Sequence, residues 1–364
     1  MKTLSRLLVG LAGLASSVTW GTPSSNPDAR PNRGSTVLRR VWHALATVLA
    51  GVLALSLGTT TALAAQVGGL KQFKVPTANS QPRAIANGSD GNLWFTEGTE
   101  FTNSPAKVAR ITPAGSITEF DVDCNFCILT DIVQGPDDIL YMTSNNPILV
   151  RFDVATETQL ASIDIPNNIA VAGDMAIDGD DIWFTDFNND SLWRYSITAG
   201  QSTQFPLQIQ PSDVVIDGAG SAWFTAPFDN AVNRLNPATG TVESFPVPDG
   251  LSPRQLTIAT DGQIWFTSRF VPQGVGRLDP TTGVVITFPT PDSPGPEGIA
   301  ASPDGSIWFT QTTQGNIASI DNTGVITEAK TVKGSEPFGI TVAPNADPWY
   351  AMMAANKIAT LRLR

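Results

Sequence analysis

Carboxylate side chains at repeating positions are the groups of this 364-residue chain that could carry acid–base or metal chemistry. Glu97 and Asp186 directly follow a Trp-Phe-Thr motif, and Glu297 precedes another one. A positioned carboxylate can remove a proton as a general base, and its oxygens are ligands that Mg²⁺ and Ca²⁺ prefer. These three residues are therefore the candidate catalytic and metal-binding groups.

Histidine is almost absent from the chain, and this excludes several kinds of enzyme. The one histidine is His43, so residues 66–364 contain no imidazole. Catalytic triads and Cys-His pairs need an imidazole base, and the two cysteines exclude a four-cysteine zinc site. Any catalysis would have to rest on carboxylates.

An internal repeat positions these carboxylates. An aromatic anchor within a Trp-Phe-Thr-like motif recurs at intervals of 47, 42, 40, 42, 43 and 41 residues. The seven anchors are Trp94, Tyr141, Trp183, Trp223, Trp265, Trp308 and Trp349. Each unit contains four short runs of strand-forming residues separated by turn signals such as Asp304-Gly305, and no unit shows helical periodicity. The sequence predicts an all-β fold, a seven-bladed β-propeller of four-stranded antiparallel blades.

The ends of the repeat array predict how the ring closes. The seventh unit ends with the strand 357–363 and lacks a fourth strand, whereas residues 70–76 precede the first unit and resemble the outer strands of the other units. We therefore expect 70–76 to pair with 357–363 and complete the seventh blade.

The repeats resemble those of the streptogramin lyase (virginiamycin B lyase) family, and are also similar to NHL repeats. The resemblance is carried by segments such as Ser302–Gln311, Gly276–Gly283 and Glu243–Pro246. It implies a seven-bladed propeller and a carbon-oxygen lyase activity. In that activity a base removes an α-proton, Mg²⁺ stabilises the developing charge, and the ring of a cyclic depsipeptide opens by elimination across an ester.

The chain departs from the family pattern at the position that matters for this reaction. The pattern places a histidine eleven residues before the tryptophan, and a glutamate after Trp-Phe-Thr in the same blade. Counting back from each anchor gives Arg83, Thr130, Ala172, Ser212, Arg254, Glu297 and Phe338. In the sixth unit Glu297 stands for the histidine and Gln311 for the glutamate. The family's proposed acid–base residue is therefore missing.

In a propeller, the starts of the inner strands and the ends of the Trp-Phe-Thr strands surround one mouth of the central channel, a common ligand site. The predicted ligand-binding residues at this mouth are Arg83, Glu97, Asp186, Arg254, Glu297 and Gln311, with Asp131, Asp213, Arg269 and Glu336 beside them. Two interpretations remain open: the carboxylates hold Mg²⁺ or Ca²⁺, or they pair with the arginines. No cofactor is required by the sequence.

Two further features of the sequence are predicted to have structural and not functional roles. Cys124 and Cys127 are predicted to form a local disulfide that shapes a loop near the mouth. Arginines that recur on the third strands are predicted to tie neighbouring blades together. These arginines are Arg110, Arg151, Arg194, Arg234 and Arg277.

The N-terminal region and the charge predict the compartment and exclude some partners. Residues 39–65 have the basic start, apolar run and Ala-rich end of a signal peptide, 1–38 form a poorly ordered extension or follow a misannotated start, and 66–364 form the propeller. We expect a secreted monomer with no membrane span once the signal is cleaved. A net charge of −11 argues against nucleic acid as a partner.

Two functions are consistent with these residues. The first is a module that binds a small molecule, a glycan or a protein at one propeller face without the histidine-dependent chemistry. The alternative is a lyase that acts on a cyclic depsipeptide or another ester with a carboxylate base and Mg²⁺.

Overall fold

The structure is a computed structural model, and the residues that it describes belong to one compact unit. The described residues are 67–98, 105–124, 127–165, 172–270, 273–290 and 295–363. The predicted extension 1–38 and the predicted signal peptide 39–65 lie outside them. No helix within these ranges is long and apolar enough to cross a membrane.

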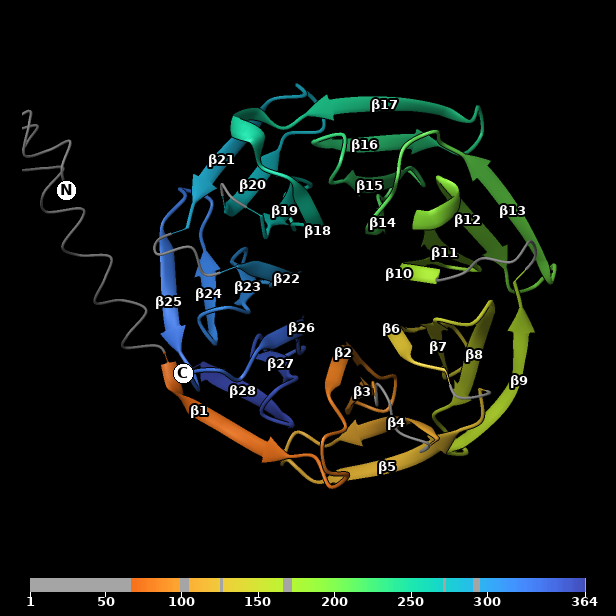
Figure 1. Cartoon of the computed structure of the whole chain (residues 1–364), viewed down its shortest axis with the longest axis vertical. Coiled ribbons are helices and arrows are strands. Elements are labelled where there is room, and N and C mark those ends of the chain that lie inside the picture. Colours follow the sequence, from red (N-terminus) through yellow and green to blue (C-terminus); the bar gives the residue numbers. More distant parts are fainter. Residues whose placement is uncertain are drawn as a thin grey trace, which may run out of the picture. The chain divides into compact units, whose positions relative to one another are not determined.

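Seven four-stranded antiparallel sheets are arranged as a ring, which confirms the predicted propeller (Figure 1). Blade 1 is β2 (Pro82–Asn87), β3 (Leu93–Glu97), β4 (Ala106–Ile111) and β5 (Ile117–Val122). Blade 2 is β6 (Leu129–Gln134), β7 (Ile139–Ser144), β8 (Ile148–Asp153) and β9 (Thr158–Asp164). Blade 3 is β10 (Ala172–Asp178), β11 (Asp181–Asp186), β12 (Ser191–Ser196) and β13 (Gln201–Pro206). Blade 4 is β14 (Val214–Ile216), β15 (Ala222–Ala226), β16 (Ala231–Asn236) and β17 (Thr241–Pro246). Blade 5 is β18 (Pro253–Ile258), β19 (Ile264–Ser268), β20 (Gly274–Leu278) and β21 (Val285–Pro289). Blade 6 is β22 (Pro296–Ala301), β23 (Ile307–Gln311), β24 (Asn316–Ile320) and β25 (Ile326–Lys330).

Blade 7 combines both ends of the array. It contains β26 (Pro337–Val342), β27 (Pro348–Met352) and β28 (Lys357–Leu363), and its fourth strand is β1 (Val67–Lys74). The register pairs Lys74 with Lys357 and Leu70 with Leu361, which confirms the predicted closure. The observed strand β1 begins three residues earlier than the predicted 70–76 and ends at Lys74.

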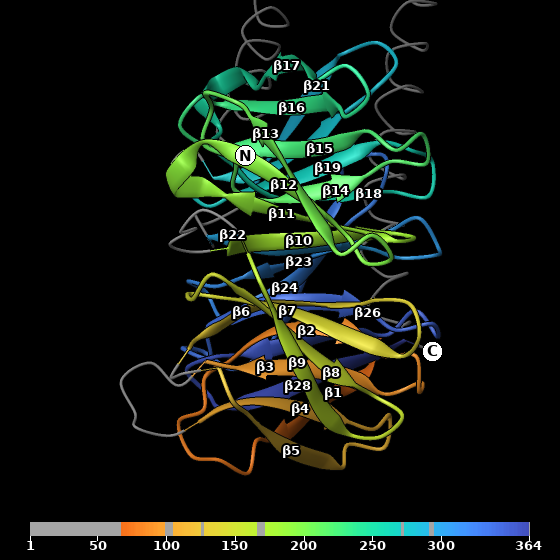
Figure 2. The ribbon, with the colours of Figure 1, turned by 90° about the vertical axis from the view of Figure 1, so that its right-hand side faces the viewer.

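Figure 2 views the ring from its side, with the outer strands β9 and β13 toward the viewer. The aromatic anchors pack between the blades, as Trp183 does against Val214 and Phe224 of the next blade. All seven anchors are buried. In most blades the anchor tryptophan also stacks on a phenylalanine of the outer strand. Trp223, for example, lies 5.4 Å from Phe245 between ring centroids. Such pairs bury a large apolar area and fix the spacing of second and fourth strands.

A threonine of the repeated motif links each of several blades to the next. The Thr225 hydroxyl accepts a hydrogen bond from the Asp213 amide of its own inner strand and donates one of 2.7 Å to the Arg254 carbonyl of the following inner strand. Four further threonines donate in the same way, namely Thr143 to Gly173, Thr185 to Ser212, Thr267 to Glu297 and Thr310 to Phe338. The hydroxyl therefore holds neighbouring inner strands at a fixed separation around the channel.

Each third-strand arginine bonds to another part of the fold, and two of the five, Arg277 and Arg110, link neighbouring blades as predicted. Arg277 lies over the Trp265 ring and donates to the carbonyl of Asn322 in the next blade, and Arg110 pairs with Glu157 of the next blade. Arg194 and Arg234 pair with acidic groups of their own blades, Asp181 and Glu243. Arg151 donates to the Ala161 carbonyl.

Removing one link of the threonine ring should lower stability measurably. In Thr225→Val the Asp213 amide and the Arg254 carbonyl lose a buried partner, so we expect the free energy of unfolding to fall by about 1–3 kcal/mol. Denaturant unfolding measures this loss of free energy, provided that the m-value is the same for the variant and the unsubstituted protein. The matched control is Thr203→Val on the exposed strand β13, which should change stability by less than about 0.5 kcal/mol. Equal effects of the two substitutions would contradict this role.

Candidate functional site

The channel mouth is the end of the central channel at which the seven inner strands begin (Figure 1). In every blade but blade 4 the inner strand starts opposite the residue that follows the Trp-Phe-Thr-like segment, as Pro82 pairs with Glu97 and Pro296 with Gln311. In blade 4 the shorter β14 starts at Val214, opposite Phe224. The topology therefore brings both sets of predicted residues to one end of the propeller. Within that end, however, the side chains separate into distinct groups.

The first group is a set of three aspartates inside the channel. Asp131, Asp174 and Asp213 come from the neighbouring blades 2, 3 and 4, and Gln255 of blade 5 follows them around the ring; all four line one cavity of ≈ 160 Å³. Asp131 and Asp213 each accept from the next inner strand, namely from the amides of Met175 (2.7 Å) and Leu256 (2.8 Å). They are thus also interblade links.

Asp174 corrects the residue count made from the sequence. Blade 3 joins β10 to β11 by a hairpin one residue shorter than those of the other blades, since Met175 pairs with Phe184 where Ile299 pairs with Phe309. The position of blade 3 that matches Glu297 is therefore Gly173 and not Ala172, as the bond from Thr143 to the Gly173 carbonyl also shows. Counting eleven residues back from Trp183 assigned the wrong residue.

Burial makes two of the channel aspartates hard to ionise. Burial and, next, the nearby Asp174 carboxylate raise the pKa of Asp131 to about 7, although two backbone amides and Arg83 oppose the shift. The same causes raise the pKa of Asp213 well above its ordinary value. At neutral pH the channel thus carries less negative charge than three aspartates suggest.

The second group is an arginine clamp around Glu297, the residue in the place of the family's histidine. Glu297 is fully buried, and its Oε1 accepts from Arg254 Nε (3.2 Å) while its Oε2 accepts from Arg269 Nη1 (3.1 Å). Arg254 also donates to the Ser212 hydroxyl. Both oxygens of Glu297 are occupied by cations, which is the arrangement of an internal ion pair and not of a base open to substrate.

Glu97 lies apart from these groups, at the junction of blades 1 and 7. It is fully buried, and its two oxygens make no hydrogen bond with any other described residue. Desolvation, and then the neighbouring Glu119 carboxylate, raise the pKa of Glu97 to about 8 against the opposing effects of Ser80 and Lys107. Glu119 is itself held by the amide and hydroxyl of Thr77.

Asp186 and Gln311 have structural partners. Asp186 is fully buried and caps the short 3₁₀ turn η1 (Phe187–Asn189), accepting from the Asn189 amide and side chain and from Trp193 Nε1. Gln311 donates to Glu328 at 2.9 Å. Neither side chain points into the channel cavity, whose lining does not include them. The six predicted mouth residues therefore do not form one site.

Arg83 is the member of the predicted set that remains available. It is half-buried, and its guanidinium lies 5.0 Å from the centroid of the Phe338 ring. Its Nε atom is buried without a hydrogen-bond partner among the described residues, and no described carboxylate lies within ion-pair distance of it. Arg83 lines both the channel cavity and the hollow outside it.

Two hollows open at the channel mouth. The first, of ≈ 310 Å³, contains Arg83, Asp174 and Arg254, with Phe187 and the Ser212 hydroxyl on its wall. The second, of ≈ 390 Å³, contains Arg269, Glu336 and Phe338. Both volumes lie at the lower end of the ~300–1,000 Å³ usual for small-molecule sites. The first hollow shares Arg83 and Asp174 with the channel cavity, so we call it the mouth hollow and treat it as the candidate binding site.

The loops around the mouth carry a disulfide and exposed aromatics. Cys124 and Cys127 are bonded to each other in the connection between β5 and β6. Phe228 and Phe270, in the loops after β15 and β19, are 74% and 61% exposed, and Phe228 contacts Phe187 of the mouth hollow. Apolar surface thus extends from the hollow along blades 3 to 5.

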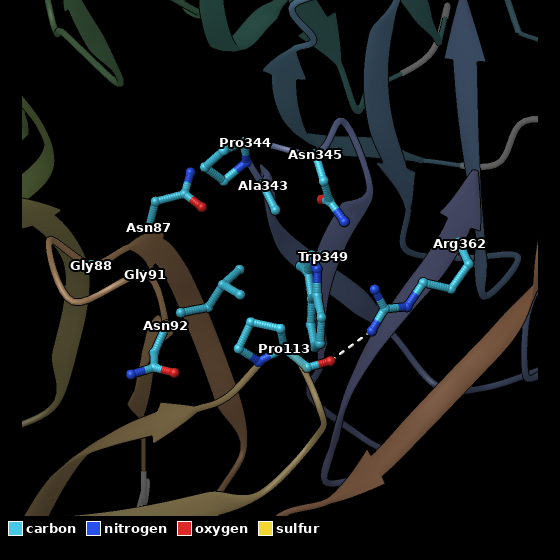
Figure 3. Close-up of a pocket in the computed structure, with 11 residues that line it drawn as sticks. Asn87, Gly88, Gly91, Asn92, Pro113, Ala343, Pro344, Asn345, Trp349 and Arg362 are labelled. Atoms are coloured by element: carbon cyan, nitrogen blue, oxygen red, sulfur yellow. Dashed lines mark hydrogen bonds between the residues drawn. The ribbon is translucent and has the colours of Figure 1, made fainter. Parts of the chain in front are cut away.

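A third pocket lies at the opposite end, where blade 7 meets blade 1 (Figure 3). Trp349 forms its wall, and Arg362 bridges the two blades by donating to the Pro113 carbonyl at 2.6 Å and to Asp347 at 3.1 Å. These groups are used in closing the ring, so this pocket is explained by the fold.

Sequence reasoning missed Asp174, Gln255 and Phe187 of the channel and mouth hollow. The Asp-Gly pair at 178–179 signals the short two-residue hairpin, and using it would have placed Asp174 in line with Asp131 and Asp213. Gln255 stands ten residues before Trp265, as Asp131 and Asp213 stand before their own anchors, so the same count would have found it. Phe187 lies in the turn η1, and the repeat spacing does not predict where that turn lies relative to the hollow.

The three candidate metal ligands do not fit a metal ion. Asp186 is held by its turn, Glu297 by two arginines, and Glu97 stands beside Lys107 at a different blade junction. Across the described ranges no group of three His, Cys, Asp or Glu side chains is placed to hold an ion. We derive no reaction step through Mg²⁺ or Ca²⁺.

Comparison with known proteins agrees with the architecture. The model of the virginiamycin B lyase family matches residues 61–269 and 150–364, which together span most of the chain. The chain belongs to the virginiamycin B lyase family. No sequence among the curated proteins matches it.

Solved structures of this family have the same fold. A streptogramin B lyase is 24% identical, with a TM-score of 0.73, over 81% of this chain and 98% of the other. Virginiamycin B lyase from Staphylococcus aureus is 22% identical, with a TM-score of 0.72, over 81% and 99%. A third structure, with the same values, is a catalytically inactive histidine-to-alanine variant of that enzyme with quinupristin.

Glu97 should make stability depend on pH. Its pKa of about 8 in the folded protein exceeds the 4.5 of an ordinary glutamate, so the unfolded chain loses this proton first as pH rises. Stability from this group is complete below about pH 4.5 and is lost by about pH 8, with a slope of up to ~1.4 kcal/mol per pH unit.

Denaturant unfolding at several pH values tests this in Glu97→Gln, which cannot ionise. We expect the variant to gain stability relative to the unsubstituted protein as pH rises from about 5 to about 8. Glu157→Gln, at an exposed position, should show no such trend. A Glu97→Gln profile parallel to that of the unsubstituted protein would contradict the burial argument.

The arginine clamp should matter for stability more than a surface ion pair does. Glu297→Gln leaves Arg254 and Arg269 without their anion, and we expect a loss of about 2–4 kcal/mol, below the ~3–5 of a fully buried pair because both arginines keep some access to water. The control Glu243→Gln breaks the exposed pair with Arg234 and should cost less than about 1 kcal/mol. A neutral Glu297→Gln in thermal unfolding would contradict the clamp.

Proposed function

We propose that this chain is a secreted member of the virginiamycin B lyase family that binds a ligand at the channel mouth and does not use the family's histidine-dependent lyase chemistry. The observation that carries the proposal is the clamp at Glu297. Where the family pattern has an acid–base histidine, this chain has a fully buried carboxylate held by two arginines.

Support for binding comes from the mouth hollow. It is a concave site built by several blades, and it offers an unpaired guanidinium, hydroxyl groups and an aromatic wall. Such a mixture of a few polar groups and apolar surface is typical of a site that orients a small molecule. Secretion follows from the predicted signal peptide at 39–65 and stays a proposal.

The alternative, a lyase with a carboxylate base and Mg²⁺, has less support. Glu97 is the candidate whose raised pKa would suit a base, but it lines neither of the two hollows at the mouth. A base must lie within hydrogen-bond reach of the proton that it removes. Glu97 has no such access to a ligand in the mouth.

The test is incubation of the full chain with quinupristin, with and without Mg²⁺ or Ca²⁺ after EDTA treatment. Elimination yields an isomer of the same mass, so chromatographic separation followed by fragment-ion analysis detects ring opening. We expect quinupristin to stay intact under conditions in which Staphylococcus aureus virginiamycin B lyase opens it. We also expect no saturable rise of melting temperature with either ion. Metal-dependent ring opening that is lost in Glu97→Gln or Glu297→Gln would overturn the proposal.

The binding half is tested in the same preparation by a melting-temperature screen of small molecules, glycans and peptides. Binding to the native state raises the melting temperature. We expect at least one compound to stabilise the unsubstituted protein but not Arg83→Gln. A screen in which every stabilising compound acts equally on Arg83→Gln would contradict binding in the mouth hollow.

A further inference from the structure

The mouth hollow is lined by two arginines, Arg83 and Arg254, and one aspartate, Asp174, and neither Arg83 nor Asp174 forms an ion pair with a described residue. Arg83 has no ion pair among the described residues, and its Nε atom is buried without a partner. The only hydrogen bond of the Asp174 carboxylate to a described residue comes from a neutral group, Gln255 Nε2, at a long 3.4 Å. Both side chains line the same hollow of ≈ 310 Å³.

The other charged groups around the hollow have partners. Arg254 is paired with the buried Glu297 and also donates to Ser212. Asp213 and Asp131 each accept two backbone amides, and burial raises the pKa of both. Against the effect of burial, Asp174 lies near enough to Arg254 to raise the pKa of that guanidinium, but it forms no ion pair with it. Arg83 and Asp174 are therefore the two charged groups of the hollow without an ion pair, and they can meet charges from a ligand.

The geometry points to a zwitterionic ligand of the amino-acid or short-peptide class. Its carboxylate would lie against the Arg83 guanidinium, and its ammonium group against the Asp174 carboxylate. The aromatic ring of Phe187 on the wall of the hollow would contact an apolar side chain. This inference rests on the proposed binding function and specifies its ligand.

Physical chemistry favours this class over singly charged ligands. A guanidinium binds a carboxylate through charge-assisted hydrogen bonds, which are about twice as strong as neutral ones. A lone anion would be attracted by Arg83 but repelled by Asp174, and a lone cation would be attracted by Asp174 but repelled by Arg83. A zwitterion satisfies both groups at once and leaves neither charge unpaired in the hollow.

The experiment is isothermal titration of the full chain at about pH 6, below the pKa of Asp131. The probes share one aromatic group and differ in charge: L-phenylalanine, its amide, 3-phenylpropanoate and L-phenylalanylglycine. We expect one of the two zwitterions, L-phenylalanine or L-phenylalanylglycine, to bind at least about tenfold more tightly than the amide and 3-phenylpropanoate. Which of the two binds more tightly tells a free amino acid from a peptide.

Three variants locate the site. Arg83→Gln and Asp174→Asn should each weaken the preferred zwitterion by about tenfold or more, and Phe187→Ala should reduce the preference for L-phenylalanine over L-alanine. The controls Arg194→Gln on the third strand β12 and Asp164→Asn on the outer strand β9 make the same changes away from the mouth and should bind normally.

Several results would overturn the inference. The first is that neither zwitterion binds at about 10 mM, a concentration that corresponds to only ~2.7 kcal/mol of affinity. The second is that the singly charged probes bind as tightly as the zwitterions. The third is that Arg83→Gln and Asp174→Asn both bind the zwitterion as tightly as the unsubstituted protein. Such results leave the quinupristin test untouched, so failure of this inference is distinguishable from failure of the proposed function.

Discussion

A threonine hydroxyl that joins one inner strand to the next is the interaction on which the site depends. Thr225 accepts from its own blade and donates to the carbonyl of Arg254, the residue whose side chain enters the mouth hollow. Equivalent bonds run from Thr267 to the Glu297 carbonyl and from Thr310 to the Phe338 carbonyl. Because the hydroxyl fixes the backbone at these positions, the variable side chains there are presented at constant spacing while their identity is free to change.

That division between fixed backbone and variable side chain explains how a family member can keep the fold without the family's chemistry. The backbone of Glu297 is held by Thr267 as its equivalents are held elsewhere. Its side chain, however, is enclosed by two arginines. The Glu297 carboxylate is thereby satisfied internally, and Arg83 and Asp174, which form no ion pair, line the hollow together with Arg254.

The fold could be predicted almost completely from the sequence, and the site only in part. Seven aromatic anchors at near-constant spacing predict the blade number, and the lack of a fourth strand in the seventh unit predicts the closure by β1. The mouth residues were predicted as one ring, but the structure separates them, because the residue after Trp-Phe-Thr is buried within its blade. Asp186 thus bonds to the turn and strand that follow it, and Glu97 lies beside Lys107 and Glu119 of its own blade. Whether two charges meet, as Glu297 and Arg269 do, depends on side-chain conformations that spacing does not encode.

The central claim is that the mouth hollow, through Arg83, is where this protein meets its ligand. The most direct measurement is nuclear magnetic resonance of the arginine Nε–H groups during titration with L-phenylalanylglycine. Our account predicts a saturable shift of the Arg83 signal, with the signals of the third-strand residues Arg194 and Arg234 unchanged. A shift of the Arg194 or Arg234 signal while the Arg83 signal stays unmoved would contradict the account and place binding elsewhere on the propeller.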